Sequence, residues 1–476
     1  MKNRIVISLL AGTLALGACN LDETPYGFYS EDNFFKTAAD AEAAVMYAYG
    51  TLNYLEYSRT IFFLGDMASE TMLENFFKYA FIGVNRANAV IKKVPDAGFS
   101  QEQKDLFLGE AYFLRAWNYF NLVRNFGLVP LHKSVVETVD QTSTALAPDM
   151  DAMYDLILSD CRRAAELLPV YETPKIGRAD RVAAQALAAK AYLYVASAKE
   201  HGVKLYRDMH RDATVMYDSA AYFAGEVIEK QSVYGFESSL LDIYDVEKAR
   251  GKEHIFIMAM DRSGSSEGQY SKISKMFIPY IDGATLYLKQ GDKDEYIPTH
   301  DGWGEYQTTV AFYNTFDASD KRKTELIVDK VYKADGTLLG EYPGKIPYPF
   351  CRKYIDPNFE GDNTSTRPSL LRFSDVALMY AEAAGPTAKA YELVNFIRSR
   401  AGLGDMKPNL GKDEFRREIL KERTFELAFE GDHVYDLRRW NRITTDVPEA
   451  AGLSEDQVTF YPIPQAEINL NGSLRP

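Results

Sequence analysis

The chain has 476 residues, of which 46% are hydrophobic, so it can bury a large core in one large domain or in several ordinary ones. Its 54 basic and 68 acidic residues give a net charge of −14 at pH 7. Such a surface repels the phosphates of nucleic acids and anionic lipid headgroups, so nucleic-acid binding is disfavoured and a neutral, cationic or protein ligand fits better.

The N-terminus, MKNRIVISLLAGTLALGAC, predicts an export signal. Lys2 and Arg4 precede an apolar run of about fourteen residues, the order typical of secretory signal peptides, and the run is too short to span a bilayer. Its end, LGAC, resembles the signal of bacterial lipoproteins, in which the cysteine is acylated and becomes the first mature residue. We therefore expect a lipoprotein signal peptide over residues 1–18 and a lipid anchor on Cys19. An ordinary signal peptide with a coincidental cysteine is the alternative.

Several later segments have the apolar spacing of buried helices, and they are rich in Ala and Tyr. They cover residues 102–126, 150–168, 181–198, 212–230, 374–384 and 387–401. Small residues such as Ala184, Ala188 and Ala191 let helix axes approach closely. Antiparallel helix pairs of this composition are typical of degenerate tetratricopeptide repeats. The sequence predicts a mostly α fold, a tetratricopeptide-like solenoid with its helices mainly within 80–232 and 372–430.

Residues 253–371 have a different character. The helical period fades, a strand-like run covers 255–258, and Gly, Pro, Asp and aromatic residues punctuate the rest. A loop-rich insertion of this length in a compact protein is usually functional. We expect a single domain over 19–476, in which the solenoid carries a large irregular lobe with short strands and a ligand-binding role.

No motif in the chain predicts catalysis or a cofactor. Residues 264–268, GSSEG, match GxSxG, but a nucleophile elbow also needs a buried parallel sheet and a helix after the serine. Asp292, Asp294 and Glu295 suggest calcium by charge alone, yet Ile297 stands where an EF-hand loop requires glycine. The histidines are scattered, and nothing singles out a carboxylate pair for glycosidase chemistry. We expect no enzyme activity, no metal and no cofactor.

Two cysteines remain if Cys19 carries lipid. Cys161 and Cys351 can form one disulfide in an exported protein, and two structural thiols are an equal alternative. No clustered Cys/His spacing supports zinc.

Aromatic residues are abundant, with 32 Tyr, 27 Phe and 3 Trp. Their flat apolar faces and polar rims suit the C–H faces of sugars or peptide side chains, although any one tyrosine is more often part of the core. Trp303 stands out because Gly302 and Gly304 leave its ring without bulky neighbours in sequence. The candidate ligand-binding residues in the lobe are Trp303, Tyr270, Tyr280, Tyr287 and Tyr306.

Several segments together resemble the SusD/RagB family. They include YGFYSEDNFFKTAADAEAAVMYAYGTL, GEAYFLRAWNYFNLVRNFGLVPL, LLRFSDVALMYAEA, ILKERTFELAFEGDHVYDLRRWN and FYPIPQAEINLN, in this order over nearly the whole chain. The resemblance implies a lipoprotein of the outer membrane, exposed at the cell surface. Such a protein binds an oligosaccharide, or in some members a peptide, and sits as a lid on a SusC-like TonB-dependent transporter. It delivers its ligand and performs no chemistry on it. The resemblance also implies a solenoid of about four helical repeats with a variable, loop-rich region that holds the ligand.

The resemblance also assigns residues. Glycan-binding members place aromatic platforms at positions that match Tyr270 and Trp303. A third platform falls in the loop after Asp66, and here the interval 69–79 is short and lacks tryptophan, which favours a small or shallowly bound ligand. The family's usual C-terminal ending is absent, and Thr424 and His433 stand where the family often has arginine. Capture of a glycan is the first hypothesis; capture of a peptide, a protein-interaction scaffold and a glycoside hydrolase are the alternatives.

The stretch FELAFEGDHVYDLRRWN, residues 425–441, concentrates charge. Upstream and within it, glutamates recur every fourth residue, at Glu418, Glu422, Glu426 and Glu430, which places them on one helix face. Gly431 suits the left-handed residue that closes a helix. We expect the charged residues that follow to form an acid and arginine network that pins the last helix to the repeats; they are Asp432, Asp436, Arg438 and Arg439.

Overall fold

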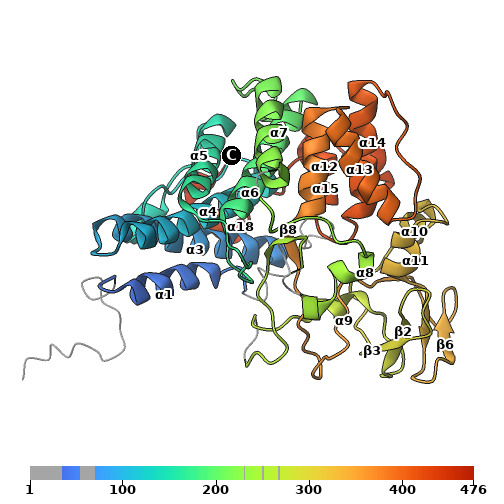
Figure 1. The fold of residues 1–476 in the computed structure, drawn as a ribbon. Coiled ribbons are helices and arrows are strands. Elements are labelled where there is room, and N and C mark those ends of the chain that lie inside the picture. The colour runs from blue at the N-terminus through green and yellow to red at the C-terminus, as the bar shows by residue number, and fades with distance from the viewer. Residues whose placement is uncertain (1–34, 54–69, 230, 249–250, 266–267, 476) are drawn as a thin grey trace, which may run out of the picture.

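The computed structural model describes residues 35–53, 70–229, 231–248, 251–265 and 268–475. Long helices, each packed against the next one along the chain, form a curved stack (Figure 1). The last two of these helices both pack on α12. In chain order the helices are α1 (Ala38–Tyr49), α3 (Glu70–Lys93), α4 (Gln101–Phe126), α5 (Met150–Leu167), α6 (Arg181–Glu200), α7 (Ala213–Glu229), α12 (Phe373–Ala384), α13 (Ala388–Arg400) and α14 (Lys412–Glu426).

Local sequence sets the helix ends. The side chains of Ser100, Asp149 and Asp180 each accept a hydrogen bond from a backbone N–H of the first turn of the helix that follows. Gly127 and Gly385 follow the last residues of α4 and α12 with φ of 70° and 76°, a conformation that favours glycine. Each of the six predicted helices is present with bounds within two residues of the prediction.

The irregular lobe leaves the stack between α7 and α12. Its first strand, β1, pairs antiparallel with its last, β8, so the two stems of the lobe lie side by side. A four-stranded sheet of order β3-β2-β5-β6 and a β4-β7 pair fill the lobe. The strands are β1 (His254–Ile257), β2 (Leu286–Lys289), β3 (Tyr296–Thr299), β4 (Ile327–Val328), β5 (Lys330–Tyr332), β6 (Leu338–Glu341), β7 (Phe350–Cys351) and β8 (Ser369–Arg372).

Short helices complete the lobe and the C-terminal region. They are α8 (Leu240–Ile243), α9 (Ile273–Phe277), α10 (Val310–Thr315), α11 (Lys321–Leu326), α15 (His433–Arg439), α16 (Ile443–Asp446), α17 (Glu455–Val458) and α18 (Gln465–Leu470). Single 3₁₀ turns cover Val94–Asp96, Val139–Thr142, Val246–Lys248, Pro448–Ala450 and Gly472–Leu474. The prediction of a mostly α, tetratricopeptide-like solenoid with an irregular lobe is confirmed.

The solenoid and the irregular lobe have separate apolar cores. The largest core runs through α1 to α7 and includes β1, β8 and α12, while a smaller one joins α12, α13 and α14. The lobe has its own core around its four-stranded sheet, with Ile278, Leu286, Val331 and Phe350 at its centre. The stems therefore belong to the core of the solenoid, and the far end of the lobe is held by its own side chains.

A buried ion cluster centred on Glu426 joins the lobe to the solenoid; we call it the Glu426 cluster. The Glu426 carboxylate accepts hydrogen bonds from Arg372 (2.9 Å), at the end of β8, and from Arg400 (2.7 Å), at the end of α13. Both arginines also pair with Glu253, which lies just before β1. Four elements distant in sequence thus meet on one buried set of charges.

Two more glutamates of the predicted series, Glu422 and Glu430, extend the cluster, whereas Glu418 has no ion pair to any described residue. Glu422 pairs with Arg322 of α11 at 2.6 Å, and Glu430 pairs with Lys353 at 2.6 Å and with Arg372 at 2.8 Å. α14 ends at Glu426, so Glu430 lies in the turn that follows the helix, while Gly431 has the expected left-handed φ of 80°.

The predicted acid and arginine network after Gly431 is confirmed in three of its four residues. Asp432 pairs with Lys190 of α6, Asp436 pairs with Arg423 and Arg439, and Arg439 also pairs with Glu382. The prediction is wrong for Arg438. Its guanidinium donates to the backbone oxygens of Arg124 and Val458 and stacks over Tyr461, because the carboxylates nearby are already paired.

The two cysteines do not pair. Cys161 is buried on α5 in the solenoid, and Cys351 is buried on β7 in the lobe. Of the alternatives, the structure supports two structural thiols. No helix in the described part of the chain is long and apolar enough to cross a membrane.

Replacing Glu426 by Gln tests the Glu426 cluster. The variant E426Q keeps the side-chain shape but leaves Arg372 and Arg400 buried with less compensating charge. We expect the free energy of unfolding at pH 7 to fall by about 3 to 5 kcal/mol, measured by urea unfolding followed by circular dichroism. E418Q is the matched control, because Glu418 lies half-buried on the same helix and has no ion pair to any described residue; its effect should stay within about 0.5 kcal/mol.

The pH dependence of this difference provides a second control. Burial raises the pKa of Glu426, but the charges of Arg400 and Arg372 outweigh burial and hold that pKa well below its usual range. A carboxyl group with a depressed pKa stabilises the fold above its unfolded pKa and loses that contribution as pH falls through the folded pKa. The free energy of unfolding of the wild type should therefore exceed that of E426Q by its full amount above about pH 4.5. The difference should shrink steadily as pH falls from there toward the depressed pKa of Glu426 in the folded protein. Equal stability of the two proteins at pH 7 would contradict the role of the cluster.

Candidate ligand-binding site

The loop 301–306 is held against the segment that follows α9. The carboxylate of Asp301 accepts hydrogen bonds from the backbone N–H groups of Ile281 (2.5 Å) and Gly283 (2.7 Å). A Cβ at Gly302 would lie 1.7 Å from the carbonyl oxygen of Ile278, so only glycine fits there. Gly304 has a φ of 66°, which also favours glycine. The two glycines that flank the tryptophan in sequence are therefore required by the backbone.

These contacts present Trp303 to solvent. Its backbone N–H donates to the oxygen of Lys275 at 2.6 Å, while 41% of the residue stays exposed. The Nζ of Lys275 lies 5.4 Å from the centre of the indole ring and forms an ion pair of 2.5 Å with Asp362. The hydrogen bond from Lys275 lowers the pKa of Asp362, so this carboxyl group is charged at neutral pH. The ring is thus held through its backbone, with the Lys275 ammonium group over one of its faces.

Tyr280 lies beside this loop, and Tyr270 lies beside the segment that carries Asp362. Ser271, next to Tyr270, exchanges two backbone hydrogen bonds with Thr364, which brings Tyr270 to the segment that carries Asp362. Tyr270 is half-buried, with the Nζ of Lys272 at 5.4 Å from its ring centre. Tyr280 is 69% exposed and follows Pro279, whose oxygen accepts from Gly302. We call Tyr270, Lys272, Lys275, Tyr280, Trp303 and Asp362 the aromatic surface.

The structure separates the other two candidates from this surface. Tyr306 is only 5% exposed and packs against Phe277 with ring centres 5.6 Å apart, so its ring belongs to the interior of the lobe. Tyr287 lies half-buried in the middle of β2, opposite Pro298 and Tyr332 of the neighbouring strands. Aromatic residues crowd this part of the sequence, so the sequence alone does not distinguish a ring in the lobe interior or in the sheet from one at the surface.

Sequence reasoning missed the charged members of the surface. Lys275 and Asp362 are 87 positions apart, and each looks like an ordinary solvated charge in the sequence. The buried side chain of His300 lies under α9, with its Nε2 3.1 Å from the hydroxyl of Ser274. Burial lowers the pKa of His300, so its ring is neutral at pH 7. Only the local spacing of Lys272 and Lys275 around α9 could have indicated a basic edge.

The remaining features that the sequence singles out are not part of the aromatic surface, and some of them lie outside the described residues. Residues 70–79 form the start of α3 and are not a loop, while 54–69 lie outside the described residues, as does Cys19. The acidic residues Asp292, Asp294 and Glu295 lie in the turn between β2 and β3. The GxSxG segment follows a strand that pairs antiparallel, and the described strands form no parallel sheet. The C-terminal segment docks through Asn471, which donates to the oxygens of Thr142 and Thr144.

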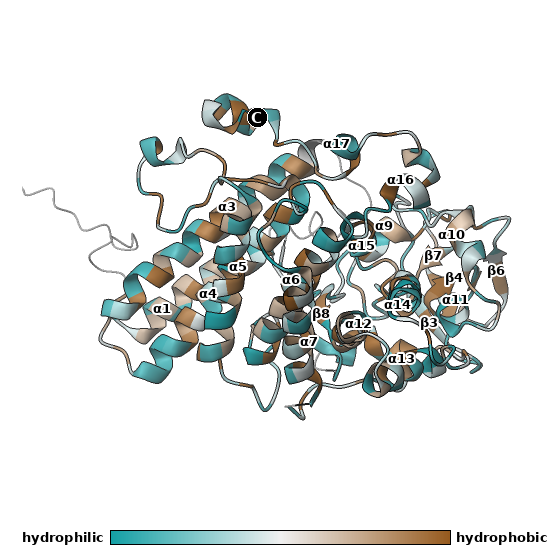
Figure 2. Cartoon of the chain, turned by 90° about the horizontal axis from the view of Figure 1, so that it is seen from above, coloured by the Kyte–Doolittle hydropathy of each residue, from teal (hydrophilic) through white to brown (hydrophobic). Residues whose placement is uncertain are grey.

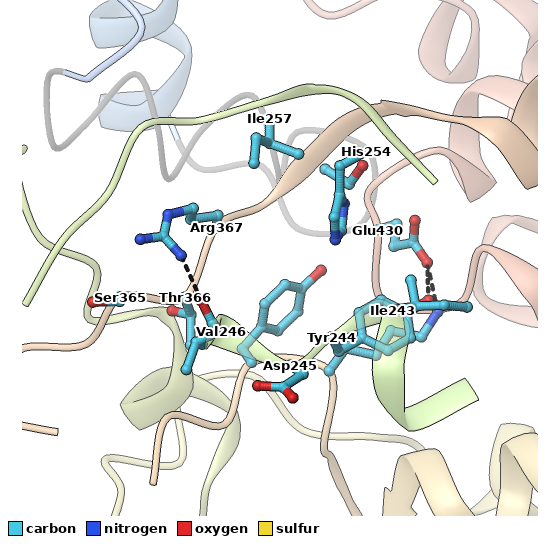
Figure 3. A pocket seen from close by; sticks show the side chains of 13 residues that line it. Ile243, Tyr244, Asp245, Val246, His254, Ile257, Ser365, Thr366, Arg367 and Glu430 are labelled. Atoms are coloured by element: carbon cyan, nitrogen blue, oxygen red, sulfur yellow. Dashed lines mark hydrogen bonds and ion pairs between the residues drawn. The ribbon is translucent and has the colours of Figure 1, made fainter. Parts of the chain in front are cut away.

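A small internal cavity of about 30 Å³ lies behind the lobe stems (Figure 3). His254, Arg367 and Tyr244 surround it, and the His254 Nδ1 and Arg367 Nε atoms have no hydrogen-bond partner among the described residues. Burial lowers the pKa of His254, so its ring is neutral at pH 7. A cavity of this size holds one or two water molecules and excludes a sugar ring. It completes the polar interior and is not a ligand site.

Comparisons with known proteins agree with this architecture. A model of the family described as "Starch-binding associating with outer membrane" matches residues 21–193, and a model of the "SusD family" matches residues 328–458. SusD-like protein P2 of Formosa agariphila is 26% identical over 535 residues, which span 100% of this chain and 99% of that protein.

Solved structures share the fold. A SusD homologue from Bacteroides thetaiotaomicron superposes with a TM-score of 0.77 at 19% identity, over 94% of this chain and 98% of the other. A laminarin-binding SusD-like protein gives a TM-score of 0.72 at 24% identity, over 91% and 97%. With two SusD family models matching separate parts of the sequence and a relative similar from end to end, the chain belongs to the SusD-like family.

Proposed function

We propose that this protein captures an oligosaccharide on the aromatic surface and delivers it to a SusC-like TonB-dependent transporter, while a lipid on Cys19 anchors it to the outer membrane at the cell surface. The proposal concerns binding and transfer and assigns no chemistry to the protein. Membership of a family whose model is described as starch-binding and associated with the outer membrane supports the coarse function, and so does the similarity to a laminarin-binding protein.

The observation that carries the proposal is the exposure of Trp303 on a fixed backbone. A large apolar ring that is 41% exposed gains nothing for folding from that exposure, and here two required glycines and a lysine hold it in place. Ring faces of this kind stack on the C–H faces of sugars, and fixing them before binding lowers the entropic cost. The adjacent Lys272, Lys275 and Asp362 offer hydrogen-bonding groups to sugar hydroxyls.

The alternatives predict different behaviour. A peptide-binding member would use the same exposed rings, so peptides belong in the same binding experiment. A protein-interaction scaffold can also expose Trp303 and Tyr280, but it would bind neither glycans nor peptides in that experiment. A glycoside hydrolase would release reducing sugar from a glycan, and loss of that release on mutation of a carboxylate pair would overturn the binding-only proposal.

The variant Trp303→Ala tests the aromatic surface. We expect its affinity for the bound glycan, found by screening laminarin oligosaccharides with other glycans and peptides, to fall roughly 10- to 30-fold, because truncating a central aromatic contact typically costs about 2 kcal/mol. Isothermal titration calorimetry measures the change. The melting temperature should stay close to that of the wild type, because the ring is largely outside the core.

Tyr222→Ala serves as its matched control. Tyr222 is 61% exposed on α7, in the solenoid and outside the lobe, and its loss should leave glycan affinity unchanged. If Trp303→Ala bound every glycan and peptide of the screen as the wild type does, the aromatic surface would not be the binding site.

The lipid anchor has a direct test. Mass spectrometry of the mature protein should find an acylated N-terminal Cys19. In cells that lack the SusC-like transporter, Cys19→Ala should release the protein from the membrane fraction, because the lipid is then the one attachment that the proposal leaves. An unmodified N-terminus at another residue would refute the anchor without affecting the glycan proposal.

The transporter partnership is tested by co-expression. We expect this protein to co-purify in mild detergent with a SusC-like TonB-dependent transporter encoded beside it, and Trp303→Ala to co-purify equally, since the aromatic surface serves the ligand. Recovery of both proteins separately under all detergent conditions would argue against a stable complex.

A further inference from the structure

A second hollow, of about 380 Å³, opens along one face of α14. Figure 2 shows α10, α15 and α16 around the same helix. Within α14, Arg417, Leu420, Lys421 and Thr424 line the hollow, at the spacing that places side chains on one helix face. We call this hollow the α14 groove. It is large enough for a sugar ring or a comparable group.

The base of the α14 groove is apolar. The rings of Phe312 and Phe425 are inclined by only 14°, with their centres 6.4 Å apart, and Leu420 and Leu437 lie beside them. Phe312 and Phe425 are both half-buried, so part of each ring faces the hollow. This base provides the flat apolar contact that a sugar ring uses.

The rim of the α14 groove is basic. Arg417 and Lys421 are both exposed, and no ion pair joins either of them to another residue in the described ranges. The third cation, Arg442, pairs with Asp446 through two hydrogen bonds of 2.6 Å each. The lining therefore holds three permanent cations against one carboxylate, in a chain whose net charge is −14.

No ion pair within the described fold accounts for the two neighbouring positive charges of Arg417 and Lys421. Arg417 and Lys421 are four residues apart on one helix, and like charges at this spacing destabilise a helix by a few tenths of a kcal/mol, roughly. Elsewhere on α14 the charged residues Glu422, Arg423 and Glu426 are all buried in ion pairs. An anion between the two free cations would remove their repulsion and pair them.

The α14 groove is separate from the aromatic surface. Phe312, which lines the groove, contacts Phe429 at 6.1 Å between ring centres, and Phe429 contacts Phe277 of α9 at 5.9 Å. This row of rings stands between the groove and the loop that carries Trp303. A smaller hollow of about 290 Å³ adjoins the groove at Lys421 and Phe425, but it contains Asp317 and Glu418 and is not basic overall.

We propose that the α14 groove is a second ligand site, which binds an acidic oligosaccharide through the carboxylate or sulfate group of one sugar. Arg417 and Lys421 pair with the anionic group, and the sugar ring packs on Phe312 and Phe425. The choice of a sugar as ligand rests on the proposed function, whereas the choice of an anion rests on the groove itself. Neutral glycans bind at the aromatic surface alone, whereas acidic glycans also bind in the α14 groove.

Calorimetry with matched probes tests the second site. The double variant R417Q/K421Q removes both free cations, and the exposed positions of both leave the core intact. We expect its affinity for a hexamer of galacturonic acid, or for a sulfated oligosaccharide of the same length, to fall at least 10-fold, and affinity for neutral oligosaccharides to stay unchanged. The two acidic probes distinguish a carboxylate site from a sulfate site.

The control variant K407Q/K412Q changes the net charge equally. Lys407 and Lys412 are exposed at and before the start of α14 and do not line the groove, so the acidic probes should bind this variant as they bind the wild type. Equal losses in both double variants would reveal only a general charge effect and overturn the site.

Two further outcomes decide the proposal. Failure of the wild type to bind either acidic probe at millimolar concentration overturns it, as does binding of hexaglutamate as tight as that of the hexuronate, since a sugar would then not be the preferred ligand. Failure of the proposed function is a different result: Trp303→Ala would leave neutral glycan binding unchanged while R417Q/K421Q still lost the acidic probes.

Discussion

The Glu426 cluster is the interaction on which the rest of the structure depends. It joins the two stems of the lobe, through Glu253 and Arg372, to α13 through Arg400 and to α14 through Glu426. Buried charges of this kind add little net stability when complete, but the loss of one partner leaves the others uncompensated. The cluster therefore acts mainly by specificity: only an arrangement that brings all four elements together satisfies it.

The position of the lobe follows from that constraint. β1 and β8 are brought side by side, and the chain between them is free to form a separate core and to vary its loops. Within the lobe, Asp301 and the flanking glycines fix the loop of Trp303 against α9. A rigid scaffold that carries exposed aromatic rings on short loops is the arrangement expected of a preorganised binding surface.

The overall charge and the local charge of this protein point to different ligands. A net charge of −14 disfavours anions over the surface as a whole, and the aromatic surface contains both signs, with Lys275 paired to Asp362. The α14 groove is a local exception, because no ion pair joins Arg417 or Lys421 to a described residue and the one carboxylate in its lining, Asp446, is already paired with Arg442. Fields in a concave site depend on its own lining more than on the distant charges, which water and salt screen.

The sequence by itself determined the helices, because the apolar period and capping residues such as Ser100 and Asp180 act over a few positions, and it also predicted the strand at 255–258 and the exposed Trp303. It misjudged Arg438, and it did not indicate the burial of Tyr306; the surroundings of both residues come from distant segments. Arg372 and Glu426 are 54 positions apart, and Lys275 and Asp362 are 87 apart, so their partners were decided only when the chain folded. The preference of a segment for helix or strand depends on neighbouring residues. The pairing of buried charges and the exposure of a ring depend instead on which elements the tertiary structure brings together.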